Sequence, residues 1–392
     1  MVVGLSLAMR AAGLGLQQLQ QQRGHVRCLV GRSRTRQQGV LRMASSDGAV
    51  QKVVFLGTPS VAAKSLERLV EEAKSAGTFE ISAVVTQPAA MQGRGKKRAL
   101  TPSAVAAVAE ENGILTLTPE KAKDDEFLTM LEDMAPDLCI TAAYGQFLPK
   151  RFLAIPRLGT LNVHPSLLPR WRGASPIQRT LEAGDADTGV SVVWTVLKMD
   201  AGPIAAQYSE PLEGHEKAPE LLERMFEVGT EELIKLLPSV WSEDCTPSSS
   251  QVQEEEAATK ADKITVEEAQ VCFQANSAAT IHNRVRGFAG WPGVWTEFQI
   301  GDNEPERVKL LTTSVVAPPS TSEEEGSEDR QAVALENKML VATLSDGSRL
   351  GISQLQPPGK KAMDAKSFAN GLRKEPLRWV PRRDDPPAEE EG

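Results

Sequence analysis

The sequence contains no long hydrophobic run and few cysteines. No stretch of its 392 residues approaches the roughly 20 consecutive apolar residues that a membrane-spanning helix needs. Its four cysteines, Cys28, Cys139, Cys245 and Cys272, lie far apart and form no CxxC pair. We therefore expect no membrane partner, no metal, no disulfide framework and a reduced compartment. We also expect a monomer.

Acidic residues are absent from residues 1–46, as is lysine, whereas this stretch contains seven arginines. Apolar residues recur in its first 16 positions, and Gln, Gly and Ser fill much of the rest. This composition is typical of an organellar transit peptide, and we expect a mitochondrial one, with a plastid as the alternative. A secretory signal fits less well because Arg10 interrupts the apolar run. A basic RNA-binding arm is a further alternative.

Negative charge exceeds positive charge in the remainder of the chain. Subtracting the seven arginine charges of residues 1–46 from the formal net charge of −8 leaves −15 for residues 47–392. A protein this acidic does not hold nucleic acid through its overall field. Any contact with RNA therefore has to come from local basic patches.

One motif of common α/β enzymes, the glycine-rich dinucleotide-binding turn, is missing. The first apolar stretch, 52–56 (KVVFL), predicts a buried strand, and Thr58-Pro59 predicts the cap and first residue of a helix running to about residue 75. A second strand is predicted over 79–86. The turn carries one glycine instead of G-x-G-x-x-G, which disfavours a dinucleotide site. Alternating strands and helices continue to about residue 240, so we expect a Rossmann-like, doubly wound α/β domain over 47–240.

The C-terminal part of the chain has a different pattern. Residues 241–262 are rich in Ser and Glu and are interpreted as a linker. One helix (278–287) and short strands at 294–300, 308–316, 339–344 and 349–355 predict a small OB-like β-barrel domain over 263–383. Residues 317–331 form an acidic insertion, and residues 384–392 are expected to be a disordered tail.

The stretch 159–176, GTLNVHPSLLPRWRGASP, predicts a site. Asn162 and His164 are two apart on a predicted strand, so their side chains face the same side. Asp200 follows a later strand on a Gly/Pro-rich turn. The amide and the imidazole can stabilise an oxyanion, and the carboxylate can support the imidazole charge or move a proton, which suits acyl transfer. No Gly-x-Ser-x-Gly motif is present, so direct attack by a substrate amine is favoured over a covalent intermediate. The alternative is a proline-rich core connection with a satisfied histidine.

A basic loop lies between the second predicted strand and the next helix. It spans residues 87–100 and carries four positive charges around two glycines. Such a loop is either a solvated surface segment or a flexible grip on a polyanion. The four residues are Arg94, Lys96, Lys97 and Arg98.

These motifs together resemble the folate-dependent formyltransferases. NVHPSLLPRWRGASPI and the later MDAGPI match the family's signature, and VVFLGTPSVAAKSLERL, GRGKK, PDLCITAAYGQFLP and LQPPGKKAM resemble the members that act on methionyl-tRNA. The resemblance extends over about residues 52–380. It implies a Rossmann-like domain followed by an OB-like barrel that binds tRNA. It also implies 10-formyltetrahydrofolate as donor and the α-amine of methionine on initiator tRNA as acceptor, for organellar translation initiation.

The resemblance also implies roles for individual residues. Asn162, His164 and Asp200 match the catalytic trio. Folate-binding positions are Ser166, Leu167, Leu168, Pro169, Phe147 and Leu148, and tRNA-binding positions are the four basic loop residues with Arg170 and Arg172. Two rival interpretations remain open at this point: a formyltransferase acting on a small-molecule amine, and a catalytically inactive RNA-binding relative.

Overall fold

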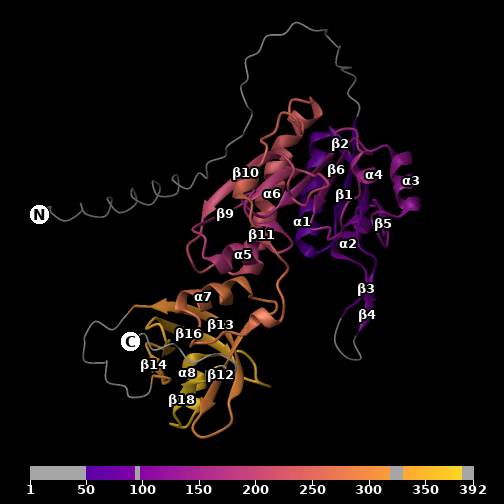
Figure 1. Cartoon of the computed structure of the whole chain (residues 1–392). Helices are drawn as coiled ribbons and strands as arrows, with labels where there is room; N and C mark the ends of the chain where they lie inside the picture. The colour runs from indigo at the N-terminus through magenta and orange to yellow at the C-terminus, as the bar shows by residue number, and fades with distance from the viewer. Residues whose placement is uncertain (1–49, 93–97, 318–329, 382–392) are drawn as a thin grey trace, which may run out of the picture.

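The computed structural model describes residues 50–92, 98–317 and 330–381. Within them, two bodies of secondary structure lie end to end (Figure 1), with the N-terminal body above the C-terminal one in that view. Several predicted features lie outside the described residues. They are the expected targeting segment (1–46), the basic residues Arg94, Lys96 and Lys97, most of the acidic insertion and the expected tail (384–392). No helix of the described part is both long and apolar enough to cross a lipid bilayer.

The N-terminal domain is built on a seven-stranded mixed sheet. Its order is β10-β9-β7-β6-β1-β2-β5. The five strands from β5 to β7 pair in parallel, whereas β9 and β10 add an antiparallel edge. This is the α/β fold that the sequence predicts. The strands are β1 (Gln51–Gly57), β2 (Phe79–Val85), β5 (Leu115–Leu117), β6 (Leu138–Ala142), β7 (Thr160–His164), β9 (Asp187–Trp194) and β10 (Ile204–Pro211).

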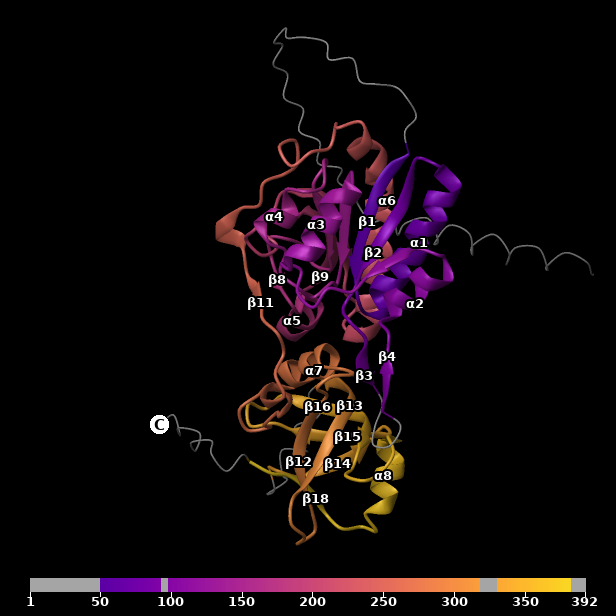
Figure 2. The same ribbon diagram turned by 90° about the vertical axis from the view of Figure 1, so that its right-hand side faces the viewer.

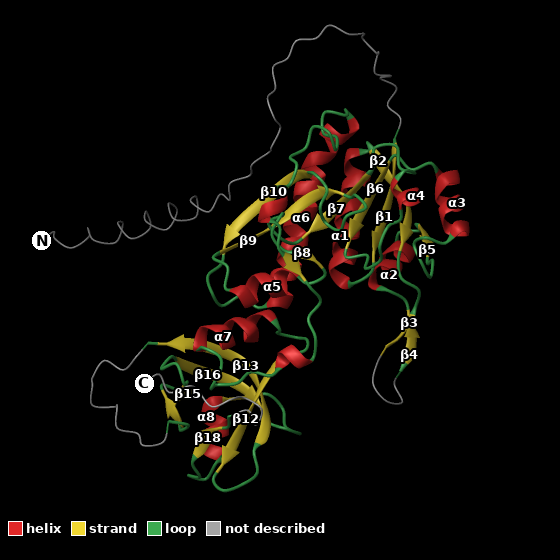
Figure 3. Cartoon of the chain, viewed as in Figure 1, coloured by secondary structure: helices red, strands yellow, loops and turns green. Residues whose placement is uncertain are grey.

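Helices cover both faces of this sheet (Figure 3), which explains why the central strands β1 and β6 are buried at five consecutive positions each. Alternate residues of β1 enter different cores: Val53 and Phe55 pack with α1, α2 and α6, and Val54 and Leu56 pack with α3 and α4. The helices are α1 (Ser60–Ala76), α2 (Ala104–Glu111), α3 (Asp125–Met134), α4 (Lys150–Leu153), α5 (Pro176–Ala183) and α6 (Ala218–Trp241).

The start of α1 differs from the expectation. Pro59 occupies the N-cap position and Ser60 begins the helix, without a side-chain cap. Thr58 does not cap this helix, because its hydroxyl donates to the carbonyl of Tyr144 at 3.3 Å. The helix after the basic loop, α2, does have a side-chain cap. Its cap is Ser103, whose Oγ accepts from the amide of Ala106 at 3.0 Å.

The basic loop is flanked by a short hairpin that the local sequence pattern does not predict. Strands β3 (Ala90–Gln92) and β4 (Ala99–Thr101) pair antiparallel on either side of residues 93–97. The hairpin projects from the N-terminal domain in the direction of the second domain (Figure 2). The loop is therefore carried on two paired strands.

The C-terminal domain is a nearly closed antiparallel barrel. Its strand order is β14-β15-β16-β13-β12-β18, and a bridge between Ala332 and Arg378 brings the two ends of this order together. The expected helix and first strand have the predicted bounds. The elements are α7 (Ala278–Gly287), β12 (Val294–Ile300), β13 (Glu306–Val316), β14 (Val333–Glu336), β15 (Met339–Thr343), β16 (Arg349–Gln356), β17 (Met363–Asp364), α8 (Ala365–Gly371) and β18 (Leu377–Trp379).

The segment between the domains lies against the N-terminal domain. Gln251 bridges to Ile204, a short 3₁₀ turn, η2 (Glu255–Ala257), follows, and β11 (Lys260–Ala261) pairs in parallel with β8 (Arg172–Gly173). We call residues 250–262 the strap. The segment expected to be a linker thus connects the domains and also contacts the proline-rich loop, which we define as residues 165–175 between β7 and α5.

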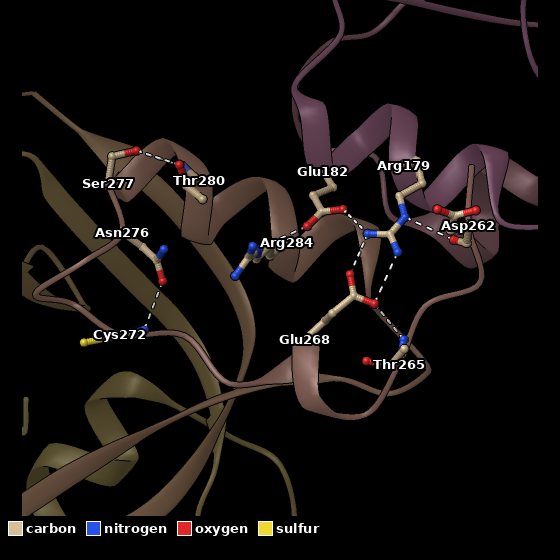
Figure 4. A network of polar contacts seen from close by, with 10 residues as sticks. All are labelled: Arg179, Glu182, Asp262, Thr265, Glu268, Cys272, Asn276, Ser277, Thr280 and Arg284. Carbon is tan, nitrogen blue, oxygen red and sulfur yellow. Dashed lines mark hydrogen bonds and ion pairs between the residues drawn. The ribbon is translucent and has the colours of Figure 1, made fainter. Parts of the chain in front are cut away.

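Polar side chains join the two domains where α5 faces α7 and the turn η3 (Glu267–Ala269), as Figure 4 shows. Arg179 of α5 pairs with Glu268 at 2.6 Å, and Glu182 pairs with Arg284 of α7 at 3.1 Å. On another part of the interface, the Nε2–H of His282 donates to the carbonyl of Gly214 at 2.9 Å. These contacts fix the position of the barrel relative to the N-terminal domain.

Candidate active site

Asn162 and His164 lie on one face of β7, as their spacing predicts. Leu161 and Val163, which alternate with them, point to the opposite face and pack in the core that contains α1 and α6. Thr141 on the neighbouring strand β6 pairs with Asn162, and its hydroxyl donates to Asn162 Oδ1 at 2.7 Å. This contact turns the amide oxygen of Asn162 toward Thr141, so the NH₂ group of Asn162 points away from Thr141 and can donate to another group.

The two ring nitrogens of His164 have different surroundings. Nε2 lies 3.0 Å from the carbonyl oxygen of Trp171. Because a carbonyl only accepts, Nε2 carries a hydrogen and the ring orientation is fixed by the loop. Nδ1 lies 3.8 Å from Asp200 Oδ2, and both side chains are largely buried. A proton on Nδ1 would therefore be held close to a carboxylate.

Asp200 lies on the turn between β9 and β10, and the backbone holds it in place. Its φ of 49° is in the left-handed region, which few non-glycine residues adopt, although aspartate tolerates it better than most. Its Oδ2 accepts from the amide of Gly173 at 3.0 Å. The carboxylate thus contacts the end of the proline-rich loop as well as facing the imidazole.

Internal hydrogen bonds hold the proline-rich loop itself. The hydroxyl of Ser166 donates to the carbonyl of Arg170 at 2.8 Å. Ser191 of β9 donates to the carbonyl of Ser166 and accepts from the amide of Leu168. Gln207 donates to the carbonyl of Leu168 at 3.0 Å. These residues shape the loop, since the polar groups named here are already engaged within the protein.

The residues expected to bind folate differ in exposure. Phe147 is 62% exposed, whereas Leu148 is buried in the core between the sheet and α3 and α4, and Leu168 is buried in a small separate apolar cluster. Leu167 and Pro169 are half-buried. Phe147 and Leu167 therefore offer apolar surface to a ligand more readily than their buried neighbours do.

Two glutamines, not identified from the sequence, hold the loop that carries Phe147. Gln146 accepts from the amide of Ala122 at 2.7 Å and donates to Gln87 Oε1 at 3.1 Å. Gln87 in turn donates to the carbonyl of Tyr144 at 3.4 Å. Nothing in the local sequence distinguishes these glutamines, since their partners are between 24 and 59 residues away.

The basic residues expected to contact tRNA are placed in three ways. Arg98 is exposed at the end of the hairpin loop. Arg170 forms a two-point ion pair with Asp185 and lies over the ring of Trp171 at 4.4 Å. Arg172 is only 9% exposed and bonds within the strap. Arg172 thus directs its charge toward Gln253 and Glu255 of the strap, and its expected contact with RNA stays a prediction.

No metal or cysteine chemistry is indicated in the described ranges. Among residues 50–92, 98–317 and 330–381, no group of three or more His, Cys, Asp or Glu side chains is arranged to hold a metal ion. Burial raises the pKa of the Cys139 thiol, which keeps it in its poorly nucleophilic form. The arrangement of an amide, an imidazole and a carboxylate is instead suited to acyl transfer without a covalent enzyme intermediate.

Family models match both domains of this fold. The model described as formyl transferase matches residues 51–237, and the model described as formyl transferase, C-terminal domain, matches residues 263–373. A solved N-formyltransferase from Helicobacter canadensis, in complex with folinic acid and dTDP-3-aminofucose, shares the fold with a TM-score of 0.53 and 14% identity. The similarity covers 79% of this chain and all of that one. Fold and domain order thus define a formyltransferase.

Curated relatives narrow the class. A methionyl-tRNA formyltransferase of Enterococcus faecalis is 36% identical over 321 residues, which are 82% of this chain and 96% of the relative. One from Thermobifida fusca is 37% identical over 322 residues, with the same two coverages. The chain belongs to the methionyl-tRNA formyltransferase family. The folate donor expected from the sequence, 10-formyltetrahydrofolate, is confirmed by this membership.

Proposed function

We propose that the chain transfers the formyl group of 10-formyltetrahydrofolate to the α-amine of methionine on initiator tRNA, in organellar translation initiation. The similarity to methionyl-tRNA formyltransferases over 96% of their length is the observation that supports this acceptor. The exposed Arg98 at the end of a projecting hairpin is consistent with a large anionic partner.

In the proposed reaction, the amine nitrogen attacks the formyl carbon directly. The carbonyl oxygen becomes an oxyanion, which the NH₂ group of Asn162 and a proton on Nδ1 of His164 stabilise. Asp200, 3.8 Å from that nitrogen, favours the charged ring and accepts the proton that the attacking amine loses. The oxyanion then collapses to the new formamide as the bond between the formyl carbon and N10 of the folate breaks, and Asp200 gives its proton to N10, so that tetrahydrofolate and formylmethionyl-tRNA are released.

The test is transfer of labelled formyl from 10-formyltetrahydrofolate to three acceptors. These are methionyl initiator tRNA, methionyl elongator tRNA and free methionine methyl ester. We expect rapid transfer to the initiator tRNA alone. Preferred transfer to the small amine would instead support a small-molecule formyltransferase, and no transfer to any acceptor would support an inactive RNA-binding relative.

The organellar part of the proposal concerns residues 1–46. Seven arginines without any acidic residue support a targeting role, and we propose a mitochondrial destination. A fluorescent protein fused after residue 50 tests it by microscopy with mitochondrial and plastid markers. Diffuse fluorescence would argue against import.

A further inference from the structure

The strap lies against the proline-rich loop and forms several hydrogen bonds with it. The amide of Trp171 donates to the hydroxyl of Thr259 at 2.9 Å, and the amide of Arg172 donates to the carbonyl of the same threonine at 2.9 Å. The amide of Ser175 donates to the carbonyl of Ala261 at 3.1 Å. The segment that joins the two domains therefore also supports the proline-rich loop.

Gln253 is the strap residue that reaches the turn of Asp200. It is buried, and its Nε2 donates to the carbonyl of Asp200 at 2.8 Å and to the carbonyl of Gly202 at 2.7 Å. Its Oε1 accepts from the Nε of Arg172 at 3.0 Å. Because arginine only donates and carbonyls only accept, the amide can face in one direction alone.

We propose that Gln253 is a positioning residue for the reaction, which fixes the Asp200 carboxylate against His164 through the backbone of the turn. The proposal rests on the role of Asp200 in the proposed function. Asp200 has a left-handed backbone conformation that needs support from its surroundings. Gln253 supplies that support at the carbonyl of the same residue, while its other arm holds Arg172, next to the glycine whose amide binds the carboxylate.

The position of Gln253 is itself fixed at both ends of the strap. Before it, the amide and carbonyl of Gln251 exchange hydrogen bonds with Ile204 at 3.1 and 2.8 Å. After it, Glu255 pairs with Arg172, and the Nε of Arg179 donates to the carbonyl of Asp262 at 3.2 Å, a contact visible in Figure 4. The amide of Gln253 is therefore presented from a tethered backbone.

The experiment compares three substitutions. Gln253→Met keeps the size of the side chain and removes all three hydrogen bonds. Gln253→Glu keeps the acceptor for Arg172 but places an oxygen next to the carbonyls of Asp200 and Gly202. It therefore tests the contacts with the turn separately from the contact with Arg172. Gln51→Met is the matched control, since Gln51 also accepts from an arginine, Arg157, at 3.0 Å, but at the opposite end of the sheet.

We expect Gln253→Met and Gln253→Glu to lower kcat by about 10²-fold with KM for folate and tRNA within a few-fold of wild type, because small displacements of a reacting group have effects of that size. Gln51→Met should leave kcat unchanged. In a double-mutant cycle with Asp200→Asn, Gln253→Met should add little further loss, because the asparagine variant already lacks the charge that Gln253 positions.

A spectroscopic measurement keeps this test separate from the proposed function. The ring resonances of His164, assigned by comparison with His164→Gln, should move in Gln253→Met and stay in place in Gln51→Met, whether or not the protein formylates tRNA. Absence of any transfer by wild type would refute the proposed function alone. Unchanged resonances, additive losses in the cycle, or failure of both Gln253 variants to fold would overturn the positioning role.

Discussion

Replacing Asp200 by asparagine isolates the charge of this side chain. Asparagine has almost the same shape, and its carbonyl oxygen can still accept from the amide of Gly173, which Asp200 Oδ2 contacts at 3.0 Å. At the observed 3.8 Å from His164 Nδ1, and with an effective dielectric constant of about 20, two unit charges attract by about 4 kcal/mol. Since about 1.4 kcal/mol corresponds to a factor of ten in rate, we expect removal of the charge to lower kcat by up to about 10³-fold.

The assay for Asp200→Asn is steady-state formyl transfer to methionyl initiator tRNA, with kcat and both KM values measured separately. We expect the loss in kcat, with folate binding near wild type. Asp137→Asn is a suitable control, because Asp137 also accepts a backbone amide, that of Lys52, at 2.8 Å and pairs with Arg157, away from the site. A loss confined to KM for folate, or a kcat close to that of wild type, would refute the assigned role.

Three further predictions concern RNA binding, a tight turn and the domain interface. Neutralising the four basic loop residues should lower the slope of log tRNA affinity against log salt by about 0.7 to 0.9 for each phosphate that the loop no longer neutralises, and equal slopes would leave the loop without a role. Gly202→Ala should lower stability by about 1–3 kcal/mol or more in thermal or denaturant unfolding, because its Cβ would lie 1.7 Å from the carbonyl oxygen of Trp194, whereas Gly371→Ala, with open space around it, should not. Burial, and secondarily Arg286, lower the pKa of His282, although its hydrogen bonds raise it. The unfolded chain therefore binds more protons, and stability should fall as the pH drops below about 6.5. His282→Gln should flatten this part of the dependence of melting temperature on pH, and an unchanged dependence would contradict the prediction.

The sheet could be predicted from the sequence because its central strands are buried on both faces. Such strands are continuous apolar runs, as at residues 52–56, and the bounds of β1 lie within one residue of the prediction at each end. Edge strand β10 was not predicted, since its second half is half-exposed and lacks that signal. The prediction that Thr58 caps the first helix is wrong. Thr58 instead has a tertiary partner, Tyr144, which local propensity does not reveal.

The site formed by Asn162, His164 and Asp200 could be proposed from the sequence, but its supporting contacts could not. Asn162 and His164 are two residues apart on one strand, which fixes their common face. The contacts of Gln253 with Asp200 and Arg172 join residues 53 and 81 positions apart. Arg172 illustrates the difficulty most directly, because an arginine in a basic cluster predicts a surface contact, whereas the strap buries it.

The course of the strap has a consequence for how this enzyme can be divided or recombined. A cut after α6 would separate the sheet from Gln253, Thr259 and Ala261, and would leave the carbonyls of Asp200 and Gly202 without the amide that they share. The smallest transplantable catalytic module therefore ends near residue 262, beyond the last helix of the sheet. A chimera that takes its second domain from a relative should keep residues 250–262 with the first domain. The barrel can then be exchanged without removing the contacts that hold the proline-rich loop.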